Sequence, residues 1–456
     1  MSTVLSEQLL KQLLSMLPAN SGSTIPITSP LDGAHIADIP ISSNEQVSFA
    51  FSRARAAQIS WQEVPLRQRI AIVNRFHKLV LANRELLCDV VQVENGKARG
   101  DAHNEVLDIA QNVRYYTKVA PNLLARKPVA GAFPIVTVAY EDHLPVGVVG
   151  LISPWNYPLC VGISDAIPAI LAGNALVWKP DVQTMFSAEL IQVVAGEGSQ
   201  VGPQIVEQAD FVMFTGSTEV GRGIAKRTGE RLIGCSLELG GKNSLIVLPD
   251  VNVKQAAAIA AIGAFSNSGQ LCVGTERIIV HQRVAVDFER DFVNAVESME
   301  LGAHVGWGSD MGPVISAKQL QRVESQVADA VSKGARVLTG GKRLTEISEL
   351  MYAPTVLTDV TSEMELCNGE TFGPVCALYT WDDETEMLNF VNGTGLGLAA
   401  SVIGKSKKAC TRIASQVRAG GISINDPYTA AWGTTAATMG GFKDSGLGRR
   451  HGAAGL

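Results

Sequence analysis

The apolar positions from residue 44 to residue 87 recur with the period of an α-helix. Charged side chains separate them, and Gly96 follows as a helix stop signal. The N-terminal stretch MSTVLSEQLLKQLLSMLP also spaces its leucines as a helix does, at positions 9, 10, 13, 14 and 17. Because Glu7 and Lys11 interrupt this pattern, it predicts a surface helix that docks on the body of the protein rather than a signal peptide.

Strand patterns begin further along the chain. IVTVAY at 135–140 and VGVVGLI at 146–152 are rich in β-branched side chains and are bounded by turn residues, so both are predicted to be strands. The first is expected to form a protruding hairpin of the kind that recruits the sheet of a partner subunit.

From there on, strand and helix patterns alternate. A helix over YPLCVGISDAIPAILAG is expected to end at Gly173, strands are expected in NALVWK, QVVAGEG and ADFVMF, and TGSTEVGRGIAKR is expected to open another helix. The same alternation returns between residues 237 and 425, in SLIVL, AAAIAAIGAF, RIIVH, the amphipathic segment from Phe288 to Met299, ARVLTGG and PVCALYTW. This pattern predicts two doubly wound α/β lobes that meet around Cys272.

Composition narrows the class of protein. A chain of 456 residues is too long for one hydrophobic core, and 46% hydrophobic with 18% charged residues is typical of an α/β enzyme. A net charge of −6 without a basic block argues against a nucleic-acid partner. No apolar run approaches the ~18 residues of a membrane span. Seven scattered cysteines, none in a CxxC pair, predict a reduced cytoplasmic protein without a structural metal site.

One cysteine stands out by its surroundings. In SNSGQLCVGTERI, Cys272 follows Asn267, Ser268, Gly269 and Gln270, which favour a turn over an apolar core. This context predicts a presented nucleophile, whose adduct oxyanion would need fixed donors. Loop amides beside Cys272 are one candidate donor, and the side-chain amide of Asn156 is another.

Asn156 and Glu238 each have two interpretations from the sequence. Asn156 lies on the turn ISPWNYP after a predicted strand, where α/β sheets place ligands, but it also suits a helix N-cap. Glu238 lies between two leucines in SLELGGKN, so it is either a buried carboxylate that serves as a general base or a solvated strand end.

Three further segments are weak candidates for a nucleotide site. The glycines of TGSTEVGRG suit a phosphate at a helix N-terminus, although their spacing is not GxGxxG. Lys179 in VWKP suits a ribose or phosphate, or is a plain surface charge. ETFGPV, which begins at Glu370, suits a nucleoside or is only a tight corner.

A cysteine hydrolase is the alternative chemistry, and it would need a histidine partner for the thiol. The seven histidines form no recognisable partner motif, and His281 in RIIVHQ is better explained as a strand-end residue. Their proximity in space stays open at this point.

The motifs together resemble the aldehyde dehydrogenase superfamily in order and approximate spacing, from about Ser29 onward. They are ISPWNYP, VWKP, FTGSTEVG, LELGGKN, NSGQLC, ETFGPV and MGGFKDSGLGR. The resemblance implies two Rossmann-like lobes plus an oligomerisation hairpin. It divides the chain into a cofactor-binding domain (1–124 and 145–236), the hairpin (125–144), a catalytic domain (237–425) and a return segment (426–456).

The resemblance also implies roles. Cys272 would attack an aldehyde, Asn156 and the Cys272 amide would hold the oxyanion, and Glu238 would activate the water that hydrolyses the thioester. No metal is implied. The implied cofactor-binding residues are Trp155, Asn156, Lys179, Pro180, Asp181, Val182, Gly216, Ser217, Leu239, Glu370 and Phe372.

The expected cofactor and substrate come from similarity to one subfamily within this superfamily. GQLC, ERI, AWGT and SGLGRRHG are most similar to the actinobacterial NADP-dependent succinate-semialdehyde dehydrogenases. Many NAD-preferring relatives have a glutamate where this chain has Val182, so NADP is expected and NAD remains admissible. Arg277, the arginine nearest to Cys272 in sequence, is interpreted as structural and not as a site for a substrate carboxylate. A homodimer or tetramer is implied.

Two segments depart from the family pattern. Between VWKPDVQT and QVVAGEG about a dozen residues of the usual crossover are absent, which leaves a connection near the lower limit of about 10 residues. The chain also stops at HGAAGL, where relatives continue into a strand that joins the oligomer. A catalytically silent scaffold therefore stands beside the hydrolase as an alternative to the aldehyde dehydrogenase.

Overall fold

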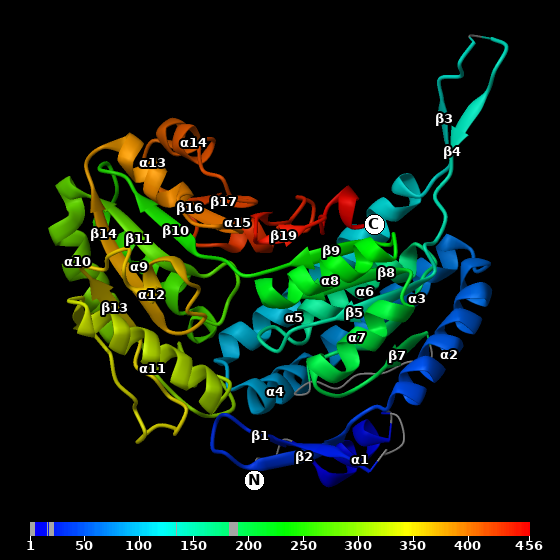
Figure 1. Ribbon diagram of the computed structural model, residues 1–456, viewed down its shortest axis with the longest axis horizontal. Helices are drawn as coiled ribbons and strands as arrows, with labels where there is room; N and C mark the ends of the chain where they lie inside the picture. Colours follow the sequence, from blue (N-terminus) through cyan, green and yellow to red (C-terminus); the bar gives the residue numbers. More distant parts are fainter. Residues whose placement is uncertain (1–4, 16, 18–21, 134, 182–189) are drawn as a thin grey trace.

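The computed structural model describes residues 5–15, 17, 22–133, 135–181 and 190–456 (Figure 1). Two α/β lobes form the body, and an N-terminal group of helices covers one of them. Val182 and most of the shortened crossover fall within 182–189, outside the described residues.

The N-terminal part is helical, as the pattern predicts. Its elements are α1 (Glu7–Leu14), β1 (Thr24–Thr28), β2 (His35–Pro40), α2 (Asn44–Gln62), α3 (Leu66–Ala82), α4 (Arg84–Asn95) and α5 (Arg99–Leu123). Gly96 ends α4 in the left-handed region, with φ of 80°. Leu13, Leu14 and Leu17 pack with the β1–β2 hairpin, which confirms a docked surface helix.

The first lobe is a six-stranded sheet in the order β19-β9-β8-β5-β6-β7. Its strands are β5 (Val148–Ile152), β6 (Ala175–Lys179), β7 (Ile191–Val193), β8 (Phe211–Thr215), β9 (Gly234–Glu238) and β19 (Gly446–Leu447), and its helices are α6 (Cys160–Leu171), α7 (Gly198–Gln208) and α8 (Thr218–Glu230). All neighbours pair in parallel except β19 with β9. Because β6 and β8 lie on opposite sides of β5, the chain changes direction there, which confirms the doubly wound topology.

The second lobe is a seven-stranded sheet in the order β12-β13-β14-β11-β10-β16-β17, parallel except for β12. Its strands are β10 (Asn243–Val247), β11 (Thr275–His281), β12 (Arg336–Thr339), β13 (Thr355–Thr358), β14 (Val375–Trp381), β16 (Ala399–Ile403) and β17 (Gly421–Ile424). Its helices are α9 (Val253–Phe265), η1 (Ser266–Gly269), α10 (Gln282–Glu297), α11 (Ala317–Ser332), α12 (Glu365–Asn368), α13 (Glu384–Asn392), α14 (Lys407–Ala414) and α15 (Thr429–Trp432). The predicted α/β alternation is confirmed in both lobes.

A hairpin projects from the body at the upper right of Figure 1. It consists of β3 (Lys127–Val129) paired antiparallel with β4 (Ala139–Glu141). The prediction of a strand over 135–140 is wrong for its first four residues, since residues 135–138 have no strand structure. The side chains of Ile135, Val136 and Val138 are largely exposed, and no neighbouring strand in the described part of the chain pairs with this segment. Strand propensity alone does not make a strand without such a partner.

The C-terminal residues link the two lobes. β18 (Phe442–Lys443) pairs with β15 (Leu396–Gly397) near the second sheet, and β19 pairs with the end of β9 in the first. A short helix, η2 (Ala453–Gly455), follows. Figure 1 shows this segment, in red, between the lobes. Among the described residues, no helix is long and apolar enough to cross a membrane.

Candidate active site

The predicted site residues of the first lobe lie at one edge of its sheet. Asn156 follows β5, Lys179 ends β6, Gly216 follows β8 and Glu238 ends β9. Since these strands are parallel, their carboxyl ends share an edge, and this is the edge where the chain changes direction. Cys272 of the second lobe lines the same cavity as Asn156 and Glu238.

The loop that carries Cys272 is held in an unusual backbone conformation. Asn267, Ser268 and Gly269 all have positive φ, at 49°, 57° and 67°. A side chain at Gly269 would meet the Gly373 carbonyl oxygen at 2.0 Å, so only glycine fits. Asn243 then fixes the end of the loop, because its Nδ2 donates to the carbonyls of Cys272 (2.7 Å) and Gly274 (2.8 Å).

The Cys272 thiol is held protonated. Burial raises its pKa to about 12, and the nearby carboxylates of Glu238 and Glu370 act in the same direction. The backbone N–H groups of Cys272 and Val273 hydrogen-bond the sulfur and oppose this shift only in part. The sequence predicts a presented thiol, and the structure places that thiol between two lobes. Attack therefore requires removal of its proton.

This electrostatic setting predicts the alkylation behaviour of Cys272 in cofactor-free protein. The rate constant for iodoacetamide modification should rise about tenfold per pH unit from about pH 7 to pH 10 without a plateau, because the thiolate fraction keeps growing. Peptide mapping isolates Cys272 from the other thiols. A plateau near neutral pH would contradict a thiol whose pKa is raised by burial.

Asn156 is 4% exposed and lines the cavity beside Cys272. Its Nδ2 donates one hydrogen bond to the carbonyl of Gln270, at 3.0 Å. A carboxamide nitrogen has two hydrogens, so the second remains for an oxygen bound at Cys272. The loop amides at Cys272 and Val273 supply donors beside the same sulfur.

Glu238 is a buried carboxylate and not a solvated strand end. It is 4% exposed, and neither carboxylate oxygen has a hydrogen-bond partner among the described residues. Burial raises its pKa to about 7, while Arg450 lowers it. A carboxylate with this pKa is suited to accept a proton from water near neutral pH.

This cavity is also lined by charged residues that sequence reasoning missed. Arg450 forms a buried ion pair with Asp165, with 2.7 Å between Nη1 and Oδ2, and both line the cavity. Asp108 also lines it, and burial raises the pKa of that carboxyl to about 7. The only sequence signal for Arg450 was the motif SGLGRRHG. That motif supported the resemblance to a subfamily, but no role was assigned to its arginines.

A second cleft of about 180 Å³ adjoins the first and also reaches Cys272 and Asn156. Seven of the predicted cofactor residues line it: Trp155, Asn156, Gly216, Ser217, Leu239, Glu370 and Phe372. Trp155 and Phe372, from different lobes, meet edge to face with ring centroids 5.5 Å apart. Gln319 and Arg322 of α11 line this cleft as well, and sequence reasoning missed both.

A buried ion pair supports the second lobe's side of the cleft. Lys242 Nζ lies 2.5 Å from a carboxylate oxygen of Glu276. The Glu276 carboxylate accepts the backbone N–H groups of Thr371 and Phe372, both at 2.9 Å. Glu370 Oε1 accepts the Gly241 N–H at 2.8 Å. The ETFGPV corner is therefore fixed against β10 and β11 by polar contacts.

Lys179, Pro180 and Arg277 are not among the residues that line the two cavities. Lys179 and Pro180 are buried at the end of β6, and burial lowers the Lys179 pKa while Asp181 raises it. Arg277 is buried and donates to the carbonyls of Phe390 and Val391, so its interpretation as structural is confirmed. Within the described ranges, no group of His, Cys, Asp and Glu side chains is arranged to hold a metal ion.

Comparison with known proteins decides the family. The sequence model of the Aldehyde dehydrogenase family matches residues 17–456. The chain belongs to the aldehyde dehydrogenase family. It is therefore an enzyme that oxidises aldehydes with a nicotinamide cofactor, NAD or NADP, and the resemblance seen in the motifs is confirmed.

Similar proteins come from mycobacteria. A Mycolicibacterium smegmatis protein, named as a putative NADP-dependent succinate-semialdehyde dehydrogenase, is 46% identical over 98% of this chain and 89% of its own length. A Mycobacterium tuberculosis protein with a similar name is 42% identical over the same shares.

Solved structures of aldehyde dehydrogenases share the fold. An NADP-dependent enzyme of E. coli gives a TM-score of 0.91 at 29% identity, covering 96% of this chain and 93% of the other. A Mycobacterium tuberculosis aldehyde dehydrogenase complexed with NAD+ gives 0.90 at 29% identity, with the same coverage.

The second cleft fits the cofactor that the family uses. Trp155, Leu239 and Phe372 give it apolar walls for a nicotinamide ring. Ser217 caps the N-terminus of α8, and Arg322 adds a guanidinium, both suited to phosphate. Gly221 lets α8 pack on Leu239, because a Cβ there would lie 2.4 Å from Leu239 Cδ2. The lining of the cleft therefore has the apolar and phosphate-compatible groups that a nicotinamide nucleotide needs.

Proposed function

We propose that this aldehyde dehydrogenase oxidises succinic semialdehyde to succinate with NADP, through a covalent intermediate on Cys272. One observation supports the covalent route above others. Cys272, Asn156 and Glu238 line one cavity, and that cavity adjoins the cleft that suits the cofactor. A nucleophile, an amide donor and a base of raised pKa are the groups that acyl chemistry on a thiol needs.

The first bond forms between Cys272 Sγ and the aldehyde carbon. The thiol proton leaves to a base in the cavity, and Glu238, with a pKa of about 7, is the candidate. The carbonyl oxygen becomes an oxyanion that accepts the free Nδ2–H of Asn156 and a loop amide beside Cys272. When bound, NADP supplies the acceptor for the hydride that leaves this carbon.

The second stage releases the acid. Loss of hydride leaves a thioester on Cys272, and Glu238 releases the thiol proton to solvent. Water then attacks the thioester carbonyl carbon while giving a proton to Glu238. The carbon–sulfur bond then breaks and the thiol is reprotonated. The sum is one aldehyde, one NADP and one water converted to one acid, one NADPH and one proton. In this scheme Cys272 and Glu238 return to their starting states.

The substrate assignment rests on relatives and on one side chain. The relatives named as succinate-semialdehyde dehydrogenases are 42–46% identical over 98% of the chain. Arg450 is the arginine that lines the cavity, where it pairs with Asp165. A substrate carboxylate would share this guanidinium with Asp165, the Thr215 hydroxyl and the carbonyls of Phe214 and Ser236.

A matched series of aldehydes tests the substrate. Succinic semialdehyde should exceed butanal, its uncharged four-carbon counterpart, by about tenfold or more in kcat/KM, which corresponds to one charge-assisted hydrogen bond. Initial rates of NADPH formation are measured for both, and then repeated with NAD, which should support a lower kcat/KM. Preference for butanal would reject the anionic substrate and leave aldehyde oxidation intact.

A hydrolase mechanism has one structural feature in its favour. His451 lines the same cavity as Cys272, which the sequence did not reveal. Burial, however, lowers the pKa of His451 to about 4, so its imidazole is neutral at physiological pH and does not stabilise a thiolate by charge. Glu238 is the better base in this cavity.

A further inference from the structure

Lys97 is a fully buried cation that lies outside both cavities. It belongs to the short connection between α4 and α5, and its side chain is 0% exposed. Its Nζ is 2.7 Å from Glu105 Oε1 and 2.6 Å from the backbone carbonyl oxygen of Asn156. The ammonium also lies 3.8 Å from the centre of the Tyr157 ring. Lys97 thus contacts the backbone of Asn156 and the residue after it.

Glu105, the partner of Lys97, holds the other end of the same turn. Its second oxygen, Oε2, accepts the backbone N–H groups of Leu159 (2.8 Å) and Cys160 (3.0 Å). These groups lie at the start of α6, where helix N–H groups have no partner within the helix. The pair therefore fixes the turn that carries Asn156 both at Asn156 and at the beginning of α6.

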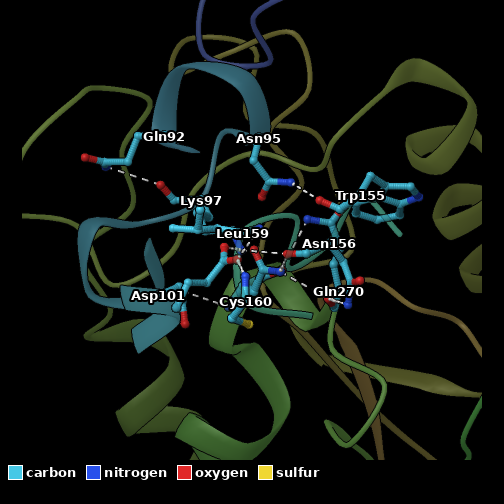
Figure 2. Close-up of polar contacts among 11 residues, drawn as sticks. Gln92, Asn95, Lys97, Asp101, Trp155, Asn156, Leu159, Cys160 and Gln270 are labelled. Atoms are coloured by element: carbon cyan, nitrogen blue, oxygen red, sulfur yellow. Dashed lines mark hydrogen bonds and ion pairs between the residues drawn. The ribbon is translucent and has the colours of Figure 1, made fainter. Parts of the chain in front are cut away.

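Two further amides complete the support (Figure 2). Asn95, the last residue of α4, donates to the Trp155 carbonyl at 2.7 Å. Asn267, from the loop before Cys272, donates from Nδ2 to the Asn156 carbonyl at 2.9 Å. That carbonyl thus accepts from Lys97 in the first lobe and from Asn267 in the second.

The same contacts set the register between Asn156 and Cys272. The carbonyl of Gln270 accepts from the side chains of both Asn156 (3.0 Å) and Asn267 (3.1 Å). Asn156 is therefore bonded to the Cys272 loop twice. Its carbonyl accepts from the Asn267 side chain, and its own side chain donates to the Gln270 carbonyl. A shift of the Asn156 turn would break bonds from two separate elements.

Stability alone does not account for this ion pair. Replacing a buried ion pair with apolar residues of similar volume is often neutral or stabilising, so such pairs are poor stabilisers. Its hydrogen bonds go to the carbonyl of Asn156, the proposed oxyanion donor, and to the main-chain N–H groups of Leu159 and Cys160 after it. We propose that Lys97 is a positioning residue, which acts through the Asn156 carbonyl to hold the Asn156 side-chain amide at the carbonyl oxygen of a substrate on Cys272. This inference rests on the proposed role of Asn156.

A double-mutant cycle tests it. The pair is neutralised as Lys97→Met with Glu105→Gln, so that no carboxylate is left buried without a partner while an oxygen remains for α6. The amplitude of the NADPH burst gives the number of active sites, and kcat is expressed per active site. This kcat should fall by about 10²-fold, since misplacing a catalytic group by about 1 Å has an effect of this size. KM for NADP should change less than about twofold.

Coupling to Asn156 separates positioning from general damage. Asn156→Ala alone should lower kcat by about 10²–10³-fold. In that background the Lys97/Glu105 change should cost less than about threefold more, because its target is already gone. Independent, multiplying losses would overturn the proposal. If wild-type protein oxidises no aldehyde, the proposed function fails instead, and the two failures are thus distinguishable.

Two further variants keep the test decisive. Arg277→Met removes another buried cation that donates to main-chain carbonyls away from both cavities, and it should leave kcat per active site unchanged. If the Lys97/Glu105 variant does not fold, Asn267→Gly removes the second donor to the Asn156 carbonyl while tolerating φ of 49°. It should show the same coupling with Asn156→Ala, and additive losses would again reject the proposal.

Discussion

Replacing Cys272 with alanine is expected to abolish aldehyde oxidation, with a loss of about 10⁴-fold or more, since the carbon–sulfur bond is the first step. The other thiol in the cavity is a poor substitute: Cys160 is 1% exposed, and burial raises its pKa well above the usual range. NADPH formation is measured under saturating aldehyde. NADP binding, followed by protein fluorescence, should remain because the cleft is otherwise unchanged.

Cys235→Ala is the matched control for that variant. Cys235 is partly exposed, lies on β9 and lines neither cavity. Its loss should leave the rate within about twofold, as for most substitutions away from the chemistry. Turnover that survives in Cys272→Ala would reject a covalent route through this thiol.

Glu238→Gln should stall the enzyme after one turnover. Thiohemiacetal formation and hydride loss do not require the water, so one equivalent of NADPH should still appear as a burst. The burst should be slower than in wild type, because the thiol proton must leave to solvent without help from Glu238. Steady-state turnover should then fall by about 10²–10⁴-fold, the usual contribution of a general base. Stopped-flow absorbance resolves both phases. A variant with a normal steady-state rate would show that Glu238 is not the base that activates water.

The same substitution should stabilise the protein at high pH. Burial raises the Glu238 pKa from 4.5 to about 7. Between these values the folded state binds more protons than the unfolded state, so this carboxyl costs stability as the pH rises. Glutamine removes a cost of up to about 3 kcal/mol at pH 8 and changes little near pH 4. Melting temperatures of variant and wild type at both pH values measure the difference, and no gain at pH 8 would contradict an unpaired buried carboxylate.

Much of the fold follows from periodicity in the sequence. The strands β5, β6, β8, β10, β11 and β14 were predicted because their residues form short apolar runs bounded by turns. Cys272 was recognised from its polar neighbours, and that loop does leave the regular elements. The role of Glu238 was open between base and strand end, and only its burial separates the two.

The parts that sequence could not predict depend on contacts across the chain. Arg450 meets Asp165 across 285 positions of sequence, and Lys97 meets the Asn156 carbonyl across 59. No local pattern encodes such pairs, because each residue alone is typical of a surface charge. The protonated state of Cys272 is likewise a product of tertiary burial. The prediction failed for the first four residues of the 135–140 strand, because no second strand among the described residues lies beside them.

The most direct test of the central claim is the mass of Cys272 during turnover. Wild type and Glu238→Gln are mixed with succinic semialdehyde and NADP, quenched in acid within the burst, digested and analysed by mass spectrometry. A covalent route through Cys272 predicts an acyl group on the peptide that carries Cys272, in proportion to the NADPH formed and persisting in Glu238→Gln. NADPH formed without any adduct on that peptide would contradict it.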